Sequence, residues 1–177
     1  YLKGIPKSHN SDLDKGILIG LNDGVEHNLT FSDLFLNNNY FIFKKIFIPI
    51  LLENTNLVVA NHQSKIRKFR DASLFSIPNN AFQDAEALTD MFNERLSTIR
   101  LNGLIVSSAS SLSNIFGLLT SQNRPDVTFI DIGTTINDLL DLPYGVRRYQ
   151  RSYEIKNPWL SLKVFKYRLS SGYKLKW

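Results

Sequence analysis

The feature that most constrains the fold is an alternation of short apolar runs with segments of helical periodicity. Five runs are strand-like because they are short, apolar and partly β-branched: residues 17–21, 57–60, 74–77, 104–106 and 127–133. Such spacing favours right-handed βαβ crossovers. We therefore predict an α/β fold, a doubly wound, Rossmann-like parallel sheet of about five strands with helices on both faces, followed by a basic C-terminal tail.

The segments between these runs predict four helices and an N-terminal arm. Residues 81–99 show the clearest helical spacing, and a second helix begins at Leu112 and reaches residue 119. Thr30 is suited to start a helix that runs to residue 52, which Pro49 should kink or split. Residues 64–70 predict a short basic helix, and the polar residues 1–15 predict an arm or the end of an upstream helix.

Polar, turn-forming residues follow each predicted strand. Parallel sheets bind ligands beyond the carboxyl ends of their strands, at a topological switch point. Asn61, His62, Asn79 and Asn80 are therefore candidate ligand contacts. For His62 the alternative is a histidine satisfied by neighbouring backbone.

The serine-rich turn between residues 104–106 and the helix that begins at Leu112 is a candidate phosphate site. Small polar residues favour a helix N-terminus, where unbonded N–H groups and the helix dipole attract anions. The residues concerned are Ser107, Ser108, Ser110 and Ser111. Many strand–helix turns carry serine and bind nothing, so the alternative is a purely structural turn. The phosphate-binding signatures GxGxxG and GxxxxGK[ST] are absent, as is the nucleophile signature GxSxG.

Carboxylates supply the other candidate chemistry. Asp131 lies inside the apolar run 127–133, where a carboxylate is costly unless it is paired, so it is a candidate base or sugar-hydroxyl acceptor, or a turn cap. Asp23 and Glu26, with His27 beside them, are candidate ligands for Mg²⁺ or Mn²⁺ on a diphosphate; the alternative is a solvated Asn-Asp-Gly turn.

The charge of the chain is concentrated at its C-terminal end. Residues 147–177 hold nine Lys and Arg and one acid, a net charge of +8, whereas the rest holds twelve bases and fifteen acids. We therefore divide the chain into a domain, 1–146, and a basic aromatic extension, 147–177. The extension either packs on the domain or contacts an anionic membrane surface, and nucleic acid is the least favoured partner. Without cysteine there is no disulfide and no thiolate zinc site. No segment reads as a signal peptide or a transmembrane span, and we expect a cytoplasmic protein, peripheral to the membrane at most.

Three segments resemble the bacterial GT-D-type glycosyltransferases. They are Ile77-Pro78-Asn79-Asn80-Ala81-Phe82, the strand–turn–helix segment 104–116, and Phe129-Ile130-Asp131-Ile132-Gly133. Asp138, Asp141, Arg148 and Tyr149-Gln150 resemble the family's Asp-rich turn and Arg-x-Tyr. The chain departs from the family's Gly-Asp-Gly-Glu motif, with Asn22-Asp23-Gly24-Val25-Glu26, and from its Gly-Pro, with Ser108-Ala109.

The resemblance implies transfer of a sugar from a nucleotide-sugar donor to a glycan or lipid-linked acceptor, in surface polysaccharide or glycoprotein synthesis. Backbone N–H groups at 108–111 would hold phosphate, and Asp131 would orient a hydroxyl. The remaining binding residues would be Gly133, Thr134 and Arg148, with Mn²⁺ or Mg²⁺ at Asp23 and Glu26. The alternative is a non-catalytic Rossmann-like module that binds a nucleotide, a glycan or another chain.

Overall fold

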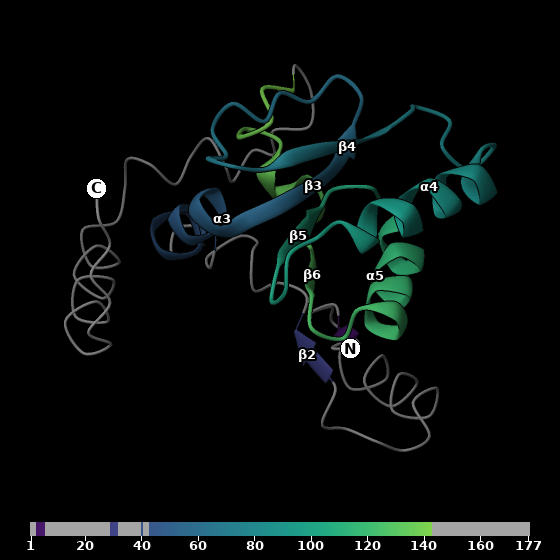
Figure 1. The fold of residues 1–177 in the computed structure, drawn as a ribbon. Coiled ribbons are helices and arrows are strands. Elements are labelled where there is room, and N and C mark those ends of the chain that lie inside the picture. The colour runs from purple at the N-terminus through teal and green to yellow at the C-terminus, as the bar shows by residue number, and fades with distance from the viewer. Residues whose placement is uncertain (1–2, 6–28, 32–39, 41–42, 143–177) are drawn as a thin grey trace.

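The structure is a computed structural model that describes residues 3–5, 29–31, 40 and 43–142 (Figure 1). Its centre is a parallel four-stranded sheet in the order β4-β3-β5-β6. The strands are β3 (Thr55–Asn61), β4 (Ser73–Ile77), β5 (Leu104–Ser107) and β6 (Thr128–Asp131). The α-helices of the described part are α3 (Ile48–Asn54), α4 (Ala85–Ser97) and α5 (Leu112–Asn123). The predicted α/β class and parallel sheet are therefore confirmed for four strands, whereas the predicted strand 17–21 lies outside the described residues.

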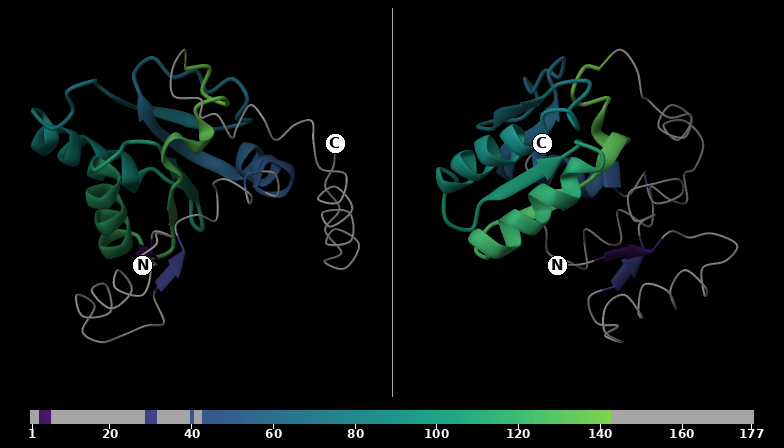
Figure 2. Two further views of the ribbon diagram at one scale, coloured as in Figure 1. Left: turned by 180° about the vertical axis from the view of Figure 1, so that it is seen from behind. Right: turned by 90° about the vertical axis from the view of Figure 1, so that its right-hand side faces the viewer.

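The order of the strands determines which face each connection covers. The chain leaves β3 toward β4 in one direction, then returns across β3 to β5 and continues to β6. Right-handed crossovers in opposite directions must lie on opposite faces of the sheet. Accordingly α4 and α5, which follow β4 and β5, lie together on one face, and the loop 62–72 that joins β3 to β4 packs on the other. The helix α3, which precedes β3, also lies on that other face (Figures 1 and 2). The expected helices on both faces are present.

The face under α4 and α5 is closed by apolar side chains that alternate along the strands. Leu57, Val59 and Ile105 point to this face, and four phenylalanines pack around them. The rings of Phe92 and Phe116 are stacked with centroids 4.3 Å apart, and Phe75 meets both edge-on. This aromatic cluster fixes α5, and with it the turn that precedes α5, against the sheet.

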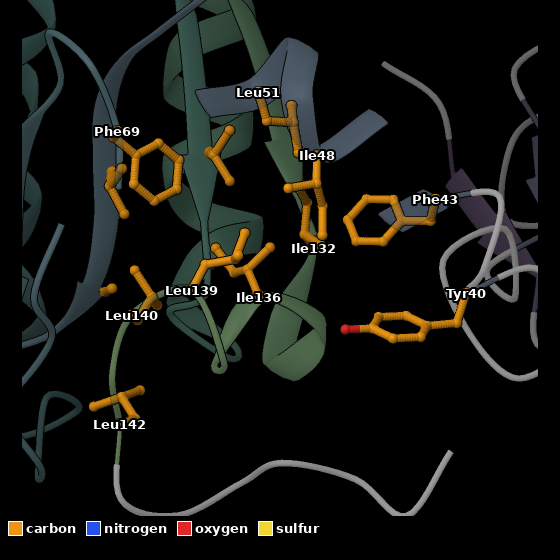
Figure 3. Packing of buried hydrophobic residues seen from close by; sticks show 13 residues of the cluster. Tyr40, Phe43, Ile48, Leu51, Phe69, Ile132, Ile136, Leu139, Leu140 and Leu142 are labelled. Atoms are coloured by element: carbon orange, nitrogen blue, oxygen red, sulfur yellow. The ribbon is translucent and has the colours of Figure 1, made fainter. Parts of the chain in front are cut away.

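The opposite face is covered by α3, by a π-helical turn η3 (Phe43–Phe47) and by the segment after β6 (Figure 3). Val58, Ala60 and Val106 supply the strand side of this cluster. The segment after β6 starts with the 3₁₀-helix η4 (Gly133–Ile136) and contributes Ile132, Ile136, Leu139, Leu140 and Leu142. Within residues 43–54, the π-helical turn ends at Phe47 and α3 begins at Ile48, so Pro49 lies in the first turn of α3, where proline is tolerated.

The prediction of a basic helix over 64–70 is wrong, because residues 64–66 are irregular and residues 67–70 form a turn and a bend. Their backbone N–H groups bond distant carbonyls in place of a helix: Lys65 N–H donates to Leu140 O, and Arg70 N–H to Leu52 O. Phe69 belongs to the cluster of Figure 3, and the partly buried Ile66 packs against that cluster. Burial of these two side chains therefore outweighs the local helical tendency.

Several predicted boundaries also differ from the observed ones. The helix predicted for 81–99 begins only at Ala85. Two four-residue turns precede it, closed by hydrogen bonds from Gln83 N–H to Asn80 O and from Asp84 N–H to Ala81 O. Thr30 does not start a helix: it lies in strand β2 (Leu29–Phe31), which pairs in parallel with β1 (Lys3–Ile5), part of the expected arm. Thr and Phe both favour strands, which explains the difference. Asp131 ends its strand and does not lie inside it.

Candidate functional site

Most of the predicted binding residues meet at the carboxyl edge of the four-stranded sheet. Asn61, Ser107 and Asp131 are the last residues of β3, β5 and β6. His62 follows β3, and the other predicted residues at this edge lie in the turns after β4, β5 and β6: Asn79, Asn80, Ser108, Ser110, Ser111, Gly133 and Thr134. Arg148, Asp23 and Glu26 lie outside the described residues. The topology thus joins residues that are up to about seventy positions apart in the sequence.

The switch point of this sheet lies between β3 and β5. The chain leaves β3 toward β4 and leaves β5 toward β6, so the two connections diverge. Ligands of open parallel sheets bind in the crevice that such divergence opens. The serine turn begins there, since Ser108 N–H donates to Val59 O of β3 at 2.8 Å.

The serine turn, residues 107–111, has a backbone shape that groups unbonded N–H groups together. Ser110 has φ of +53°, an uncommon value for a residue other than glycine, and Ser111 follows in a right-handed conformation. The N–H groups of Ser108, Ala109 and Ser113 are bonded within the protein. Those of Ser110, Ser111 and Leu112 have no acceptor within the described part of the chain. Consecutive N–H groups of this kind at a helix N-terminus form a concave site for an anion.

Beneath the turn lies a buried pair of hydroxyl groups. Ser107 Oγ and Ser113 Oγ are 2.8 Å apart, and the two residues are 0% and 1% exposed. Ser113 Oγ also accepts the Ala109 N–H at 3.3 Å. The Ser107 hydroxyl is therefore enclosed by protein, so Ser107 supports the turn from below, and its side chain does not face a ligand.

Asp131 stands beside this pair on the neighbouring strand. Ser107 and Asp131 are partners in the β5–β6 register, and Asp131 Oδ1 accepts the Gly133 N–H at 3.0 Å. Desolvation raises the pKa of Asp131, while the Gly133 N–H and then the Ser113 hydroxyl lower it. The residue remains exposed, so its carboxylate can reach a ligand at the edge of the sheet.

The polar residues after β3 and β4 are bonded to one another. Asn61 Nδ2 donates to Asn79 Oδ1 at 2.8 Å, and Asn61 Oδ1 accepts the Gln63 N–H at 3.0 Å. The amide nitrogen of Asn61 therefore joins the loops after β3 and β4, and its amide oxygen holds the loop after β3 in shape. His62 is exposed, with its backbone N–H bonded to Ile77 O, and Asn80 is exposed beside Asn79.

The segment after β6 supplies polar residues that sequence reasoning missed or assigned only by resemblance. Asn137 is 5% exposed and accepts the Ser108 hydroxyl at 3.4 Å. Asp138 Oδ2 accepts the Tyr40 hydroxyl at 3.2 Å, while its Oδ1 is buried and has no hydrogen-bond partner among the described residues. Helical spacing alone marks Ser113 as a sheet-facing residue of α5, but no pattern in the sequence shows its hydroxyl partners.

Asp141, which resembles the second acid of the family's Asp-rich turn, is engaged in ion pairs. Its carboxylate lies 3.1 Å from Lys68 Nζ and 3.2 Å from the Arg67 guanidinium. The hydrogen bond from Lys68 lowers the pKa of Asp141, and the charges of Lys68 and Arg67 add to this effect. Lys68 Nζ also donates to Asp138 O at 2.8 Å. These contacts clamp the loop after β3 to the segment after β6.

The described part of the chain shows neither a metal-binding cluster nor a membrane-spanning helix. No group of three or more His, Cys, Asp or Glu side chains is arranged to hold a metal ion there. No helix among the described residues has both the length and the apolar character needed to cross a membrane. The predicted metal ligands Asp23 and Glu26 lie in the undescribed part, so the structure does not place them.

The chain was compared with protein-family models, curated proteins and solved structures. None of the three comparisons found a match.

Proposed function

We propose that this chain is a glycosyltransferase domain that binds the diphosphate of a nucleotide-sugar at the serine turn. The observation that carries the proposal is the trio of N–H groups of Ser110, Ser111 and Leu112, which have no acceptor among the described residues and lie at the switch point, near Asp131. The resemblance of segments 77–82, 104–116 and 129–133 to the GT-D-type enzymes supports the same conclusion. The acceptor would be a glycan or a lipid-linked sugar in surface polysaccharide or glycoprotein synthesis.

The chemistry follows from the charges that this edge presents. The N-terminus of α5 carries a partial positive charge, which favours the diphosphate and stabilises the extra charge on the departing nucleotide. Asp131 would accept a hydrogen bond from a hydroxyl of the acceptor or of the donor sugar. Its raised pKa makes it a stronger base than an ordinary carboxylate. Asn79, Asn80 and Thr134 would line the remainder of the site.

The proposal of a bound divalent cation is supported by the sequence alone, because the predicted ligands Asp23 and Glu26 lie outside the described residues. Mn²⁺ or Mg²⁺, bound by Asp23 and Glu26, would neutralise charge on the diphosphate. Phosphate binding by the serine turn and hydroxyl binding by Asp131 do not depend on this cation.

The phosphate role of the serine turn is tested with Ser111→Asp. The new carboxylate would lie at the N-terminus of α5, where it stabilises the helix by about 0.3–1 kcal/mol but repels a phosphate. We expect affinity for UDP, measured by calorimetry, to fall at least tenfold, while the melting temperature rises by about 1–3 °C. Ser121→Asp is the matched control, because it adds the same charge at an exposed position near the other end of α5.

Ser121→Asp should leave UDP affinity unchanged and should lower the melting temperature slightly. Equal affinity of Ser111→Asp and wild-type protein would remove the serine turn from the binding site. UDP, UDP-glucose and UDP-galactose, each with and without Mn²⁺, form the panel of ligands.

Transfer itself is tested with Asp131→Asn. We expect turnover of a bound UDP-sugar to fall at least 100-fold, with UDP affinity changed less than threefold, since the amide keeps the shape but not the basicity. Wild-type activity in this variant would exclude Asp131 from the reaction.

One observation favours a second candidate, a non-catalytic module that binds a nucleotide or a glycan. The Asp131 carboxylate already accepts the Gly133 N–H, as a turn-capping residue does. Binding of UDP or a UDP-sugar without release of UDP over hours, with or without Mn²⁺, would favour this module over the enzyme.

The basic extension 147–177 remains a proposed peripheral membrane contact, on the cytoplasmic side. Sedimentation with vesicles of phosphatidylglycerol, at low and high salt, tests it, and no salt-dependent binding would contradict it.

A further inference from the structure

Asn137 brings a side-chain amide to the serine turn from the segment after β6. It directly follows η4 and is 5% exposed. Its Oδ1 accepts the Ser108 hydroxyl at 3.4 Å. Because Nδ2 is bonded to the same carbon as Oδ1, the amide N–H groups of Asn137 also lie at this turn. Neither the sequence patterns nor the family resemblance assigns a role to this residue.

The surrounding fold holds Asn137 in this place. Ile136 and Leu140, on either side of it in the sequence, are both 0% exposed and belong to the core cluster of Figure 3. At the start of the same segment, Ile132 N–H donates to Ser107 O at 2.9 Å, which joins the segment to the base of the serine turn. The side chain of Asn137 therefore cannot leave the turn unless part of the core is rearranged.

The nitrogen of this amide has no acceptor in the described part of the chain. Asn137 Nδ2 makes no hydrogen bond there. Three polar side-chain atoms of the described residues are fully enclosed without a partner, Thr55 Oγ1, Ser64 Oγ and Asp138 Oδ1, and Asn137 Nδ2 is not among them. Nδ2 is therefore open on one side, although the residue as a whole is buried. A donor that has lost most of its contact with water and has no acceptor is costly, so the site favours a ligand that accepts from it.

Support of Ser108 does not by itself explain a buried amide at this position. Hydrogen bonds between a hydroxyl group and an oxygen atom usually span about 2.5–3.0 Å, so the contact of 3.4 Å between Ser108 Oγ and Asn137 Oδ1 is a weak one. It also engages only the oxygen of the amide. Buried polar groups normally have all their donors paired, and here the stronger half of the bonding capacity is left for another group.

The groups around Nδ2 favour an anionic acceptor. The N–H groups of Ser110, Ser111 and Leu112 likewise have no acceptor among the described residues, and they lie at the positive end of α5. Amides form shorter and stronger hydrogen bonds with charged oxygen atoms than with neutral ones. Donors from two segments of the chain thus gather at one turn, and a phosphate group can accept from both.

We propose that Asn137 is a phosphate-binding residue, whose Nδ2 donates to an oxygen of the diphosphate held by the serine turn while its Oδ1 keeps the Ser108 hydroxyl in place. This role rests on the proposed diphosphate site at the serine turn. Ligand binding then connects the segment after β6 to the N-terminus of α5, because both donate to the same diphosphate.

Calorimetry with pyrophosphate tests this role without a nucleotide or a sugar. Asn137→Asp keeps the shape of the side chain and an acceptor for Ser108, but an oxygen replaces the donor. The matched control is Asn114→Asp, which adds the same charge at an exposed position in the first turn of α5. Repulsion should weaken binding in both variants, and the affinity of Asn137→Asp should be lower than that of Asn114→Asp by about tenfold or more.

Asn137→Ala and Asn114→Ala repeat the comparison without a change of charge. The affinity for pyrophosphate should fall at least fivefold in Asn137→Ala and less than twofold in Asn114→Ala. This neutral pair also decides the question if Asn137→Asp does not fold. Equal affinity within either pair of folded variants, or a wild-type protein that does not bind pyrophosphate, would overturn the proposal.

NMR provides a direct readout of the donor. The side-chain amide signals of Asn137, assigned by their absence in Asn137→Asp, should move downfield when pyrophosphate is added, because the amide then bonds to a charged acceptor. The amide of Asn123, which donates to Asn93 Oδ1 at 2.8 Å near the other end of α5, is the internal reference and should not move. A purely structural Asn137 predicts no such shift, so an unmoved signal in the presence of bound pyrophosphate contradicts the proposal.

The results also separate this inference from the proposed function. If pyrophosphate binds through Asn137 but the wild-type protein neither binds nor turns over UDP-sugars, the anion site stands and the proposed glycosyltransferase fails. If the wild-type protein turns over a UDP-sugar while both Asn137 variants match their controls, the role of Asn137 alone is wrong.

Discussion

The stacked rings of Phe92 and Phe116 provide the sharpest test of how the helices hold the candidate site. Both side chains are 0% exposed, and their centroids are 4.3 Å apart. Among the described residues, Phe92 makes three ring contacts, with Phe75, Phe116 and Phe129, whereas Phe116 makes two, with Phe75 and Phe92. Replacement by Leu keeps an apolar side chain of nearly the same size, so the loss of ring contacts dominates.

The number of ring contacts sets the expected magnitudes. A hydrophobic replacement of similar volume costs about 1 kcal/mol, and each aromatic pair adds about 0.5–1 kcal/mol. Phe92→Leu should therefore lower the free energy of unfolding by about 3 kcal/mol, and Phe116→Leu by about 2 kcal/mol. The double variant should lose about 0.5–1 kcal/mol less than the sum, because both single variants remove the contact between these two rings.

Urea denaturation followed by circular dichroism measures these differences. With a slope of about 2 kcal/mol per molar urea, Phe92→Leu should move the midpoint by about 1.5 M. Leu118→Ala is the control. Leu118 lies on the exposed side of α5, the helix that carries Phe116, so this substitution should lower the free energy of unfolding by less than about 0.5 kcal/mol. A larger effect for Phe116→Leu than for Phe92→Leu, or strict additivity, would refute the reasoning.

Three further predictions concern the surroundings of the site. Gly103→Ala should destabilise the protein by about 1–3 kcal/mol in the same urea assay, because a Cβ there would lie 2.8 Å from Arg100 O; an effect as small as that of the exposed Leu101→Ala would contradict this. Asp141 has a lowered pKa in the folded protein, so its contribution to stability is present above the unfolded pKa of about 3.9 and is lost as pH falls through the folded value. The melting temperature of Asp141→Asn should therefore be below that of wild type at pH 7, and the difference should shrink below about pH 4; a gap that does not depend on pH would argue against the clamp. Tyr40→Phe removes the hydroxyl that donates to Asp138, so it should destabilise the protein, whereas an unchanged melting temperature would show that this bond contributes nothing.

Much of the site could be located from the sequence, because polar residues that follow a short apolar run indicate where a strand ends. Asn61, Ser107 and Asp131 follow apolar runs, and parallel strands place such ends at one edge. The contacts among these residues could not be predicted. The bond between Asn61 and Asn79, and the burial of the Ser107 hydroxyl by Ser113, depend on side-chain directions that become definite only when the helix is packed.

The loop 62–72 shows the limit of local patterns most clearly. Its composition suggested a basic helix, yet Lys65 N–H and Arg70 N–H bond carbonyls 75 and 18 residues away in the sequence, at Leu140 and Leu52. Long-range hydrogen bonds and the burial of Ile66 and Phe69 determine its shape. Local propensities differ by less than about 1 kcal/mol per residue for most residue types, so tertiary contacts of this kind override them.

The sequence by itself determined that this protein has a parallel α/β fold, because hydrophobic periodicity reports which faces of strands and helices are buried. It also determined that polar turns lie at the ends of the strands, since those residues terminate the periodic runs. Only the tertiary structure decided that the strands follow the order β4-β3-β5-β6, that the switch point lies at the serine turn, and that Ser107 contacts Ser113 of α5 and pairs with Asp131 of β6. These are properties of packing between segments distant in the chain, and no local pattern of residues records them.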